Sequence, residues 1–457
     1  MRTIERARTL TSPANPSTST PRTAAPDNAP DAEATAKTAP AGRFARLSHL
    51  AGRSFIPLGL FARLPLAMLT VGTLTMVTSV SGSYALGGTA AGAVGIGSAM
   101  GAPLLGALAD RQGQRPVLLA AAVLNTVAVI GLVLATAGLD DAGTSYAGVL
   151  AASFAAGASS PQVGPLARVR WMALTSEVPA PGSRRDLDTA LSYESTADEV
   201  TFVLGPALVG ILASLLAPWL PLALAAAMTI ILVPAFANHP TRHAVRQPGK
   251  AARAAGGSQG GDRIPRAAAL PVLAMVCMGT FFGATQAGLS SFSAGFSGSE
   301  LAGLLYAVMG LSSAAAALSV AYWPHRFSLG WRWVLSAVLM AALAVLLLVP
   351  SSLAGMVAVL LVLGLPVGPV MVTVFAAGGV LAPAGRLGTV MTALASGIVA
   401  GTALGSSLGG HLAESGGYHA AFLVPVGAAL MLALLGAWAA AVLRRGQERY
   451  DRGPATS

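Results

Sequence analysis

Residues 64–109 read LPLAMLTVGTLTMVTSVSGSYALGGTAAGAVGIGSAMGAPLLGALA, without a single charged side chain. This stretch is too long for one membrane crossing, because a spanning helix needs about 20 apolar residues. Ser81, Gly82 and Ser83 interrupt it where a tight turn fits. Residues 200–241 and 333–385 form two more uncharged stretches of this kind. The three stretches predict pairs of membrane-spanning helices joined by short turns.

The composition places the whole chain in the same class. Of its 457 residues, 54% are hydrophobic and 10% are charged, whereas about a quarter of the residues in a soluble domain are charged. A transmembrane barrel would need alternating segments of roughly ten residues, and this pattern does not occur. The sequence predicts an all-α membrane protein with twelve transmembrane helices, near residues 64–84, 88–108, 117–137, 146–166, 190–213, 218–237, 270–293, 301–322, 333–350, 354–381, 388–410 and 420–443.

The basic residues mark one side of the membrane. Arginines and lysines occur at every second connection between the predicted spans, for example at Arg111 and in residues 242–266. The other connections carry acidic residues instead, namely Asp140, Asp141, Glu300 and Glu414. Basic loops stay in the cytoplasm, so we expect both termini to be cytoplasmic. These loops also explain the net charge of +10, and we expect no nucleic-acid partner.

The chain divides into two halves of similar length. Residues 1–55 are rich in Ala, Pro, Ser and Thr and predict a disordered cytoplasmic tail. Residues 56–237 and 269–445 each hold six predicted spans, which suggests two six-helix bundles. The polar residues 238–268 between them predict a cytoplasmic linker, and residues 446–457 a second tail.

A charged loop joins the second and third predicted spans. It reads Gly106-Ala-Leu-Ala-Asp110-Arg111-Gln-Gly113-Gln-Arg115 and resembles the signature loop G-x-x-x-D-R-x-G-x-R of the major facilitator superfamily. Gly106 permits close packing at a helix end, and Gly113 can supply a positive-φ turn. Asp110 and Arg111 can pair with each other or with neighbouring helix ends. The resemblance, which covers roughly residues 60–445, implies two bundles around a central cavity that opens alternately to either side.

Two other segments match motifs of this superfamily in part. Between the eighth and ninth spans, Arg326-Phe-Ser-Leu-Gly330-Trp-Arg332 keeps a Gly-x-Arg pattern without an acidic partner, as a decayed second copy of the loop would. In the fifth span, a Gly-Pro segment resembles part of a motif linked in this superfamily to antiporters, with matches at Gly205, Pro206 and Gly210. The second resemblance favours export.

Among the predicted spans, only the fifth holds charges well inside. Glu194 and Asp198 lie four residues apart on one helix face, whereas Glu199 points about 100° away. A carboxylate at this depth must be protonated, paired or exposed to a water-filled cavity. One interpretation makes Asp198 or Glu199 a proton carrier. The other pairs these acids with Arg168 and Arg170, or with Arg111, in a gate.

Polar uncharged residues mark a candidate substrate cavity. We assign to it Thr73, Gln162, Gln286, Thr373 and Thr392. No basic residue is predicted deep in any span, so a strongly anionic substrate would lack a counter-charge. Alternatively, each threonine hydroxyl only donates to the backbone carbonyl one turn earlier in its own helix.

Glycines recur every fourth residue in the eleventh span, at Gly397, Gly401, Gly405 and Gly409. A looser series, Gly88, Gly92, Gly97 and Gly101, occupies the second span. Such faces serve close helix packing, or they slide against the other bundle.

The function that these patterns favour is secondary transport. We predict proton-coupled export of a small amphipathic drug or metabolite. The alternatives are an uptake carrier for a neutral nutrient or sugar, and a membrane sensor that has kept the fold. No nucleotide-binding loop or nucleophile-base-metal constellation occurs, so we expect neither an enzyme nor a cofactor or metal. The preference for Arg over Lys and the abundance of Ala and Gly suggest a high-GC bacterial genome, so we expect the protein to lie in a bacterial plasma membrane. We also expect it to be a monomer.

Overall fold

A computed structural model describes residues 42–140, 146–176, 183–245, 266–296, 301–324, 326–383 and 385–451. All regular structure in these ranges is helical, and 10 of the helices are long and apolar enough to cross a membrane. Residues 1–41, most of the predicted linker, and residues 452–457 lie outside the described ranges. The prediction of an all-α membrane protein is confirmed.

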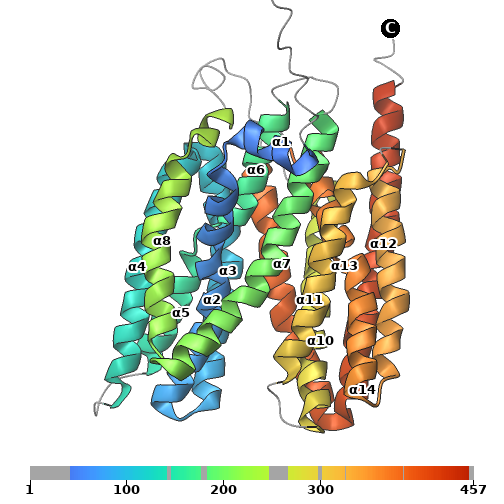
Figure 1. The fold of residues 1–457 in the computed structure, drawn as a ribbon. Coiled ribbons are helices and arrows are strands. Elements are labelled where there is room, and N and C mark those ends of the chain that lie inside the picture. Colours follow the sequence, from blue (N-terminus) through green and yellow to red (C-terminus); the bar gives the residue numbers. More distant parts are fainter. Residues whose placement is uncertain are drawn as a thin grey trace, which may run out of the picture. The chain divides into compact units, whose positions relative to one another are not determined.

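The helices of the first half overlap the predicted spans, after a short helix that precedes them (Figure 1). They are α1 (Arg43–Ala51), α2 (Phe55–Ser81), α3 (Tyr84–Gln112), α4 (Gln114–Ala137) with η1 (Gly138–Asp140), α5 (Tyr146–Ala158), α6 (Val163–Ser176), α7 (Ser183–Leu215) and α8 (Leu220–Asn238) with η2 (Pro240–Ala244).

The second half contains fewer but longer helices. They are α10 (Arg266–Ala294), α11 (Leu301–Ser319) with η3 (Val320–Tyr322), α12 (Leu329–Ala344) with η4 (Val345–Leu348), α13 (Leu353–Leu381) and α14 (Leu387–Asp451). Helix α14 is interrupted by non-helical backbone at Gly416 and Gly417, and the φ of 67° at Gly417 suits a residue without a side chain. Figure 1 shows α1 and the last turns of α14 at the same end of the helices.

The fourth predicted span, residues 146–166, is not one helix. Helix α5 ends at Ala158 and α6 begins at Val163. Pro161 has no amide hydrogen to continue the helical bonds, and the hydroxyls of Ser159 and Ser160 bond instead to the carbonyls of Ala155 and Ala156. Pro65, Pro103 and Pro206 lie inside continuous helices, which explains why proline alone did not predict the break.

Helix α1 lies within the predicted disordered tail, so the boundary near residue 55 is too late. Leu47 and Ala51, four residues apart, are buried in the hydrophobic core. Arg46 on α1 pairs with Asp186 on α7 at 2.9 Å. This short apolar stripe orders the segment, and its Phe and Leu residues distinguish it from the Ala-, Pro-, Ser- and Thr-rich residues before it.

The glycines of the eleventh span pack within their own half. A Cβ at Gly401 would lie 2.0 Å from the carbonyl oxygen of Val276 on α10, and one at Gly405 would lie 2.1 Å from that of Thr280. In the second span, Gly101 closely approaches Ala158 on α5, whereas nothing lies within 4 Å of a Cβ at Gly88 or Gly92. This arrangement fits the helix-packing interpretation. It gives no support to a face that slides against the other half.

Candidate functional site

Four charged side chains from three helices form a buried cluster in the first half. The Nη2 atom of Arg63 lies 2.5 Å from Oε2 of Glu194, and its Nη1 atom lies 2.8 Å from Oδ1 of Asp198. Arg168 completes the cluster, with its Nη2 atom 2.6 Å from the other oxygen of Asp198. The side chains of Arg63, Glu194 and Arg168 are at most 5% exposed, and that of Asp198 is 17% exposed. Buried charges of this kind are stable only when each one is paired.

The geometry of α7 places both carboxylates toward α2 and α6. Glu194 and Asp198 share one helix face, as their spacing predicts. The indole nitrogen of Trp171 on α6 donates to Oε1 of Glu194 at 2.9 Å, so both oxygens of this carboxylate are engaged. Gly164 allows α6 to approach, since a Cβ there would lie 3.3 Å from Oδ1 of Asp198.

Arg63 was missing from the predicted cluster. The sequence placed the first span from residue 64, and it placed no basic residue deep in a span. Helix α2 begins at Phe55, so Arg63 lies inside this candidate span and is 5% exposed. The one available signal was the apolar segment before Arg63, which lengthens the hydrophobic stretch on its N-terminal side.

Arg170 and Arg111 do not pair with these acids. Arg170 is fully buried, and its Nε atom donates to Gln114 at 2.8 Å while its Nη1 atom donates to the carbonyl of Phe236. Arg111 is exposed at the end of α3. Of the predicted network, the structure therefore brings together Glu194, Asp198 and Arg168.

Glu199 lies on another face of α7 and contacts the second half. The hydroxyl of Ser313 on α11 donates to its Oε1 atom at 2.8 Å. A Cβ at Gly310, also on α11, would lie 3.9 Å from its Oε2 atom. Glu199 is 6% exposed, and no ion pair to it occurs among the residues that the structure describes. It is a buried carboxyl at the contact between the two halves, without a balancing cation there.

Asp110 of the signature loop joins the two halves through the start of α14. Its two carboxylate oxygens accept the backbone N–H groups of Gly388 and Thr389, at 2.8 and 2.7 Å, and the hydroxyl of Thr389. A carboxylate at a helix N-terminus interacts favourably with the helix dipole. Of the two pairings left open for Asp110, the structure thus shows the one with a helix end. Gly113 has a φ of 93°, the positive-φ turn that the sequence predicted, and Arg115 is exposed.

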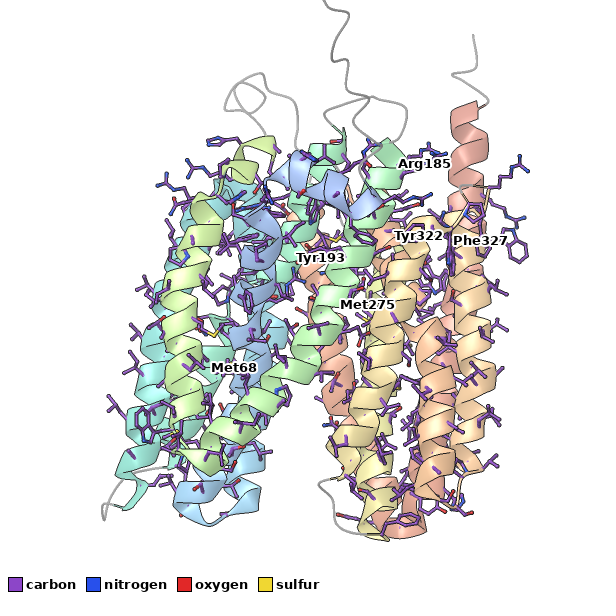
Figure 2. The ribbon with its side chains drawn as sticks, in the orientation of Figure 1. Met68, Arg185, Tyr193, Met275, Tyr322 and Phe327 are labelled. Carbon is purple, nitrogen blue, oxygen red and sulfur yellow. The ribbon has the colours of Figure 1, made fainter. Side chains whose placement is uncertain are left out.

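The second, decayed copy of the loop also contacts the other half. Arg332 on α12 pairs with Asp188 on α7 at 3.1 Å, so the acidic partner that its own segment lacks comes from the first half. On α1, Arg43 donates to the carbonyl of Ala321, and its guanidinium lies 4.7 Å from the ring centre of Tyr322. Figure 2 shows Arg185 and Tyr322 toward one end of the helices, with Met68 further along. The polar contacts of Asp110, Arg332 and Arg43 with the other half lie at the end that carries the basic loops, and the bond between Glu199 and Ser313 lies further along α7.

The predicted cavity residues are not brought into one site. The hydroxyls of Thr73, Thr373 and Thr392 each donate to the carbonyl four residues earlier, which is the alternative that the sequence left open. Gln162 donates to the carbonyl of Ser160, and Gln286 is exposed on α10. In the Gly-Pro segment, Gly205 packs against Ala67 on α2, Pro206 lies inside α7, and Gly210 has open space around it.

Substituting Gly106→Ala should separate α3 from α14. The new Cβ would lie 2.0 Å from the hydroxyl oxygen of Thr392 and 2.7 Å from the carbonyl oxygen of Gly388. Overpacking of this kind costs about 1–3 kcal/mol, enough to depopulate the contact state by roughly tenfold. Spin labels at residues 112 and 386, with Cys277→Ser as background, should report a larger fraction of long distances.

The matched control for this experiment is Gly92→Ala in the same helix, where nothing lies within 4 Å of the new Cβ. It should leave the distance distribution unchanged. An unchanged distribution in Gly106→Ala would show that α3 and α14 do not need this close approach.

Comparison with known proteins places this architecture in a family. The family model described as Major Facilitator Superfamily matches residues 55–397. A search of curated proteins found no match.

Solved transporters share the fold at low sequence identity. The human organic anion transporter MFSD10 (TETRAN) is 20% identical over 87% of this chain and 100% of its own, with a TM-score of 0.60. A bacterial homologue of the iron transporter ferroportin in an outward-facing state is 15% identical over 85% of this chain and 99% of its own, with a TM-score of 0.65. The proton:xylose symporter XylE is 15% identical over 84% of this chain and 94% of its own, with a TM-score of 0.62. With the signature loop in place at the α3–α4 turn and a family match over most of its length, the chain belongs to the Major Facilitator Superfamily and is a multi-pass membrane transporter.

Proposed function

We propose that this transporter exports a small amphipathic compound in exchange for protons, by alternating access of its two halves. The observation that carries the proposal is the buried carboxyl of Glu199, which meets α11 across the contact between the halves. The partial Gly-Pro motif favours export.

The membrane arrangement that we propose has twelve crossings in two bundles of six. The 10 candidate spans count α14 once and omit α5 and α6, which are too short singly. Helices α5 and α6 together cover the fourth predicted span. The break at Gly416 and Gly417 divides α14 into the eleventh and twelfth.

The proposed orientation places both termini and the basic helix ends in the cytoplasm of a bacterial plasma membrane. Single cysteines at residue 112 and in the linker at residue 258, in a Cys277→Ser background, should resist a membrane-impermeant maleimide added to intact cells. Cysteines at residues 141 and 298 should react. Labelling of residue 112 but not residue 141 would reverse the orientation.

We infer alternating access from the places where the halves touch. At the end of the helices that carries the basic loops, three side chains contact the opposite half, namely Asp110, Arg332 and Arg43. Apolar side chains of both halves also pack together, for example Leu191 with Ala317 and Val372, and we propose that the polar contacts break and re-form together with this packing. In this conformation they hold the proposed cytoplasmic side together.

Proton coupling follows from the difference between the two carboxyls that the sequence singled out. Asp198 lies between two guanidinium groups, which balance its charge. Glu199 accepts one described hydrogen bond, from the neutral hydroxyl of Ser313, and has no ion pair among the described residues. A buried carboxylate without a cation is costly, and protonation removes that cost. We therefore assign the transported proton to Glu199 and a structural role to Asp198.

The function can be tested in proteoliposomes that contain the purified protein. We expect accumulation of amphipathic drugs when an imposed pH gradient drives protons the opposite way, and little accumulation without the gradient. Accumulation of a neutral sugar with the proton flux would favour the uptake alternative. Binding without transport of any compound screened would favour the sensor alternative.

A further inference from the structure

A cavity of about 940 Å³ opens at the junction of the two halves, next to the signature loop. Its walls come from the ends of α3 and α6, the start of α4, η2, and the residues that lead into α14. Gly385 and Leu387 are its lining residues from the second half. The cavity is large enough for a small organic molecule.

The wall of this cavity is positively charged. Arg115 and Arg242 line it, and the nitrogens of Arg242 bond to the side chains of His243 and Asn238 rather than to a carboxylate. Asp110 also lines the cavity, but both of its oxygens are occupied by donors from the start of α14. Helix α4 begins at Gln114, so its positive dipole end lies at the same wall.

A further positive charge lies behind this wall without a counter-ion. Arg170 is 0% exposed and donates to Gln114, which lines the cavity. Its Nη1 atom bonds to a carbonyl and to the hydroxyl of Thr241, and its Nη2 atom has no hydrogen-bond partner in the described part of the chain. No carboxylate pairs with Arg170 among the described residues. A buried guanidinium normally has an anionic partner.

We propose that this cavity binds an amphipathic anion with a phosphate or carboxylate head group. Arg115, Arg242 and the start of α4 face the head group. Val169, Met172 and Leu387 supply the apolar wall for the rest of the molecule. The proposal concerns a site apart from Glu199 and does not depend on the direction or coupling of transport.

The site has a consequence for the conformational cycle. Because both halves line the cavity, the anion binds best when they are in contact at this end. A ligand that prefers one state shifts the equilibrium toward it. The anion therefore holds the cytoplasmic contacts together, whether it is a soluble metabolite or the head group of an anionic lipid.

The test uses Ser176→Cys, a substitution at an exposed lining position, in a Cys277→Ser background of the full chain in phosphatidylcholine nanodiscs. Hexyl phosphate should slow alkylation of the introduced thiol, and hexanol should not. Replacing both arginines, in Arg115→Gln/Arg242→Gln, should raise the half-protective concentration by about tenfold or more. The matched control Arg53→Gln/Arg184→Gln removes two exposed arginines outside the cavity and should leave protection unchanged.

Nanodiscs that contain phosphatidylglycerol distinguish the two possible ligands, a soluble anion and the head group of an anionic lipid. Arginine-dependent protection of the introduced thiol by this lipid alone would identify a lipid head group, and protection by hexyl phosphate alone would identify a soluble anion. The proposal is overturned if neither protects the thiol, if hexanol protects equally, or if the Arg115→Gln/Arg242→Gln protein is protected like wild type. If the protein does not transport drugs in a pH gradient but hexyl phosphate still protects the thiol, the proposed function is wrong and the anion site remains supported.

Discussion

Replacing Arg63 by methionine should lower the free energy of unfolding by about 3–5 kcal/mol, because it leaves a buried carboxylate without its cation. Glu194 is 1% exposed and has no other basic partner among the described residues. Asp198 keeps its pair with Arg168, so the largest loss falls on Glu194. Thermal unfolding in detergent, followed by tryptophan fluorescence, measures the change.

The double variant Arg63→Met/Glu194→Gln separates the missing cation from the change in shape. Its glutamine is neutral and can still accept from Trp171, so it should recover a substantial part of the lost stability. Arg53→Met, which removes an exposed arginine nearby, should change stability by no more than about 0.5 kcal/mol. A double variant that is less stable than Arg63→Met would show that Glu194 does not depend on Arg63.

This cluster shows what sequence patterns can predict in such a protein. The four-residue spacing of Glu194 and Asp198 was enough to place them on one face, because that relation is local to α7. Hydropathy was enough to predict an all-helical membrane protein, for which the structure shows 10 candidate spans, and the signature loop was enough to predict the turn at Gly113. Each of these predictions depends on residues within a few turns of one another.

The failures concern helix ends and distant partners. Hydropathy did not show that α2 begins at Phe55, so Arg63 was counted with the loops. The partner of Arg332 is Asp188, 144 residues away in the other half, and no spacing rule connects them. The break before α6 and the order in α1 depend on side-chain hydrogen bonds and on burial by other helices. Tertiary packing decides these features.

The roles of Asp198 and Glu199 can be separated by neutral substitutions. Asp198→Asn leaves Arg168 and Arg63 with less balancing charge, so it should reduce both pH-driven transport and substrate exchange.

Ser313→Ala removes the one hydrogen bond described for Glu199 and should shift the pH dependence of transport. Ser312→Ala, its neighbour, loses a bond to the carbonyl of Met309 and should not.

Glu199→Gln should abolish accumulation driven by a pH gradient while substrate exchange continues. Glutamine has nearly the same shape as glutamate and can still accept the hydroxyl of Ser313, so the contact between α7 and α11 is retained. What is lost is the ability to gain a proton on one side and release it on the other. Without that cycle the imposed gradient cannot bias the two states, although bound substrate can still carry the protein between them. Counterflow of a labelled substrate, measured beside pH-driven accumulation in the same proteoliposomes, separates the two activities. Accumulation at the wild-type level in Glu199→Gln would show that the proton travels through another group.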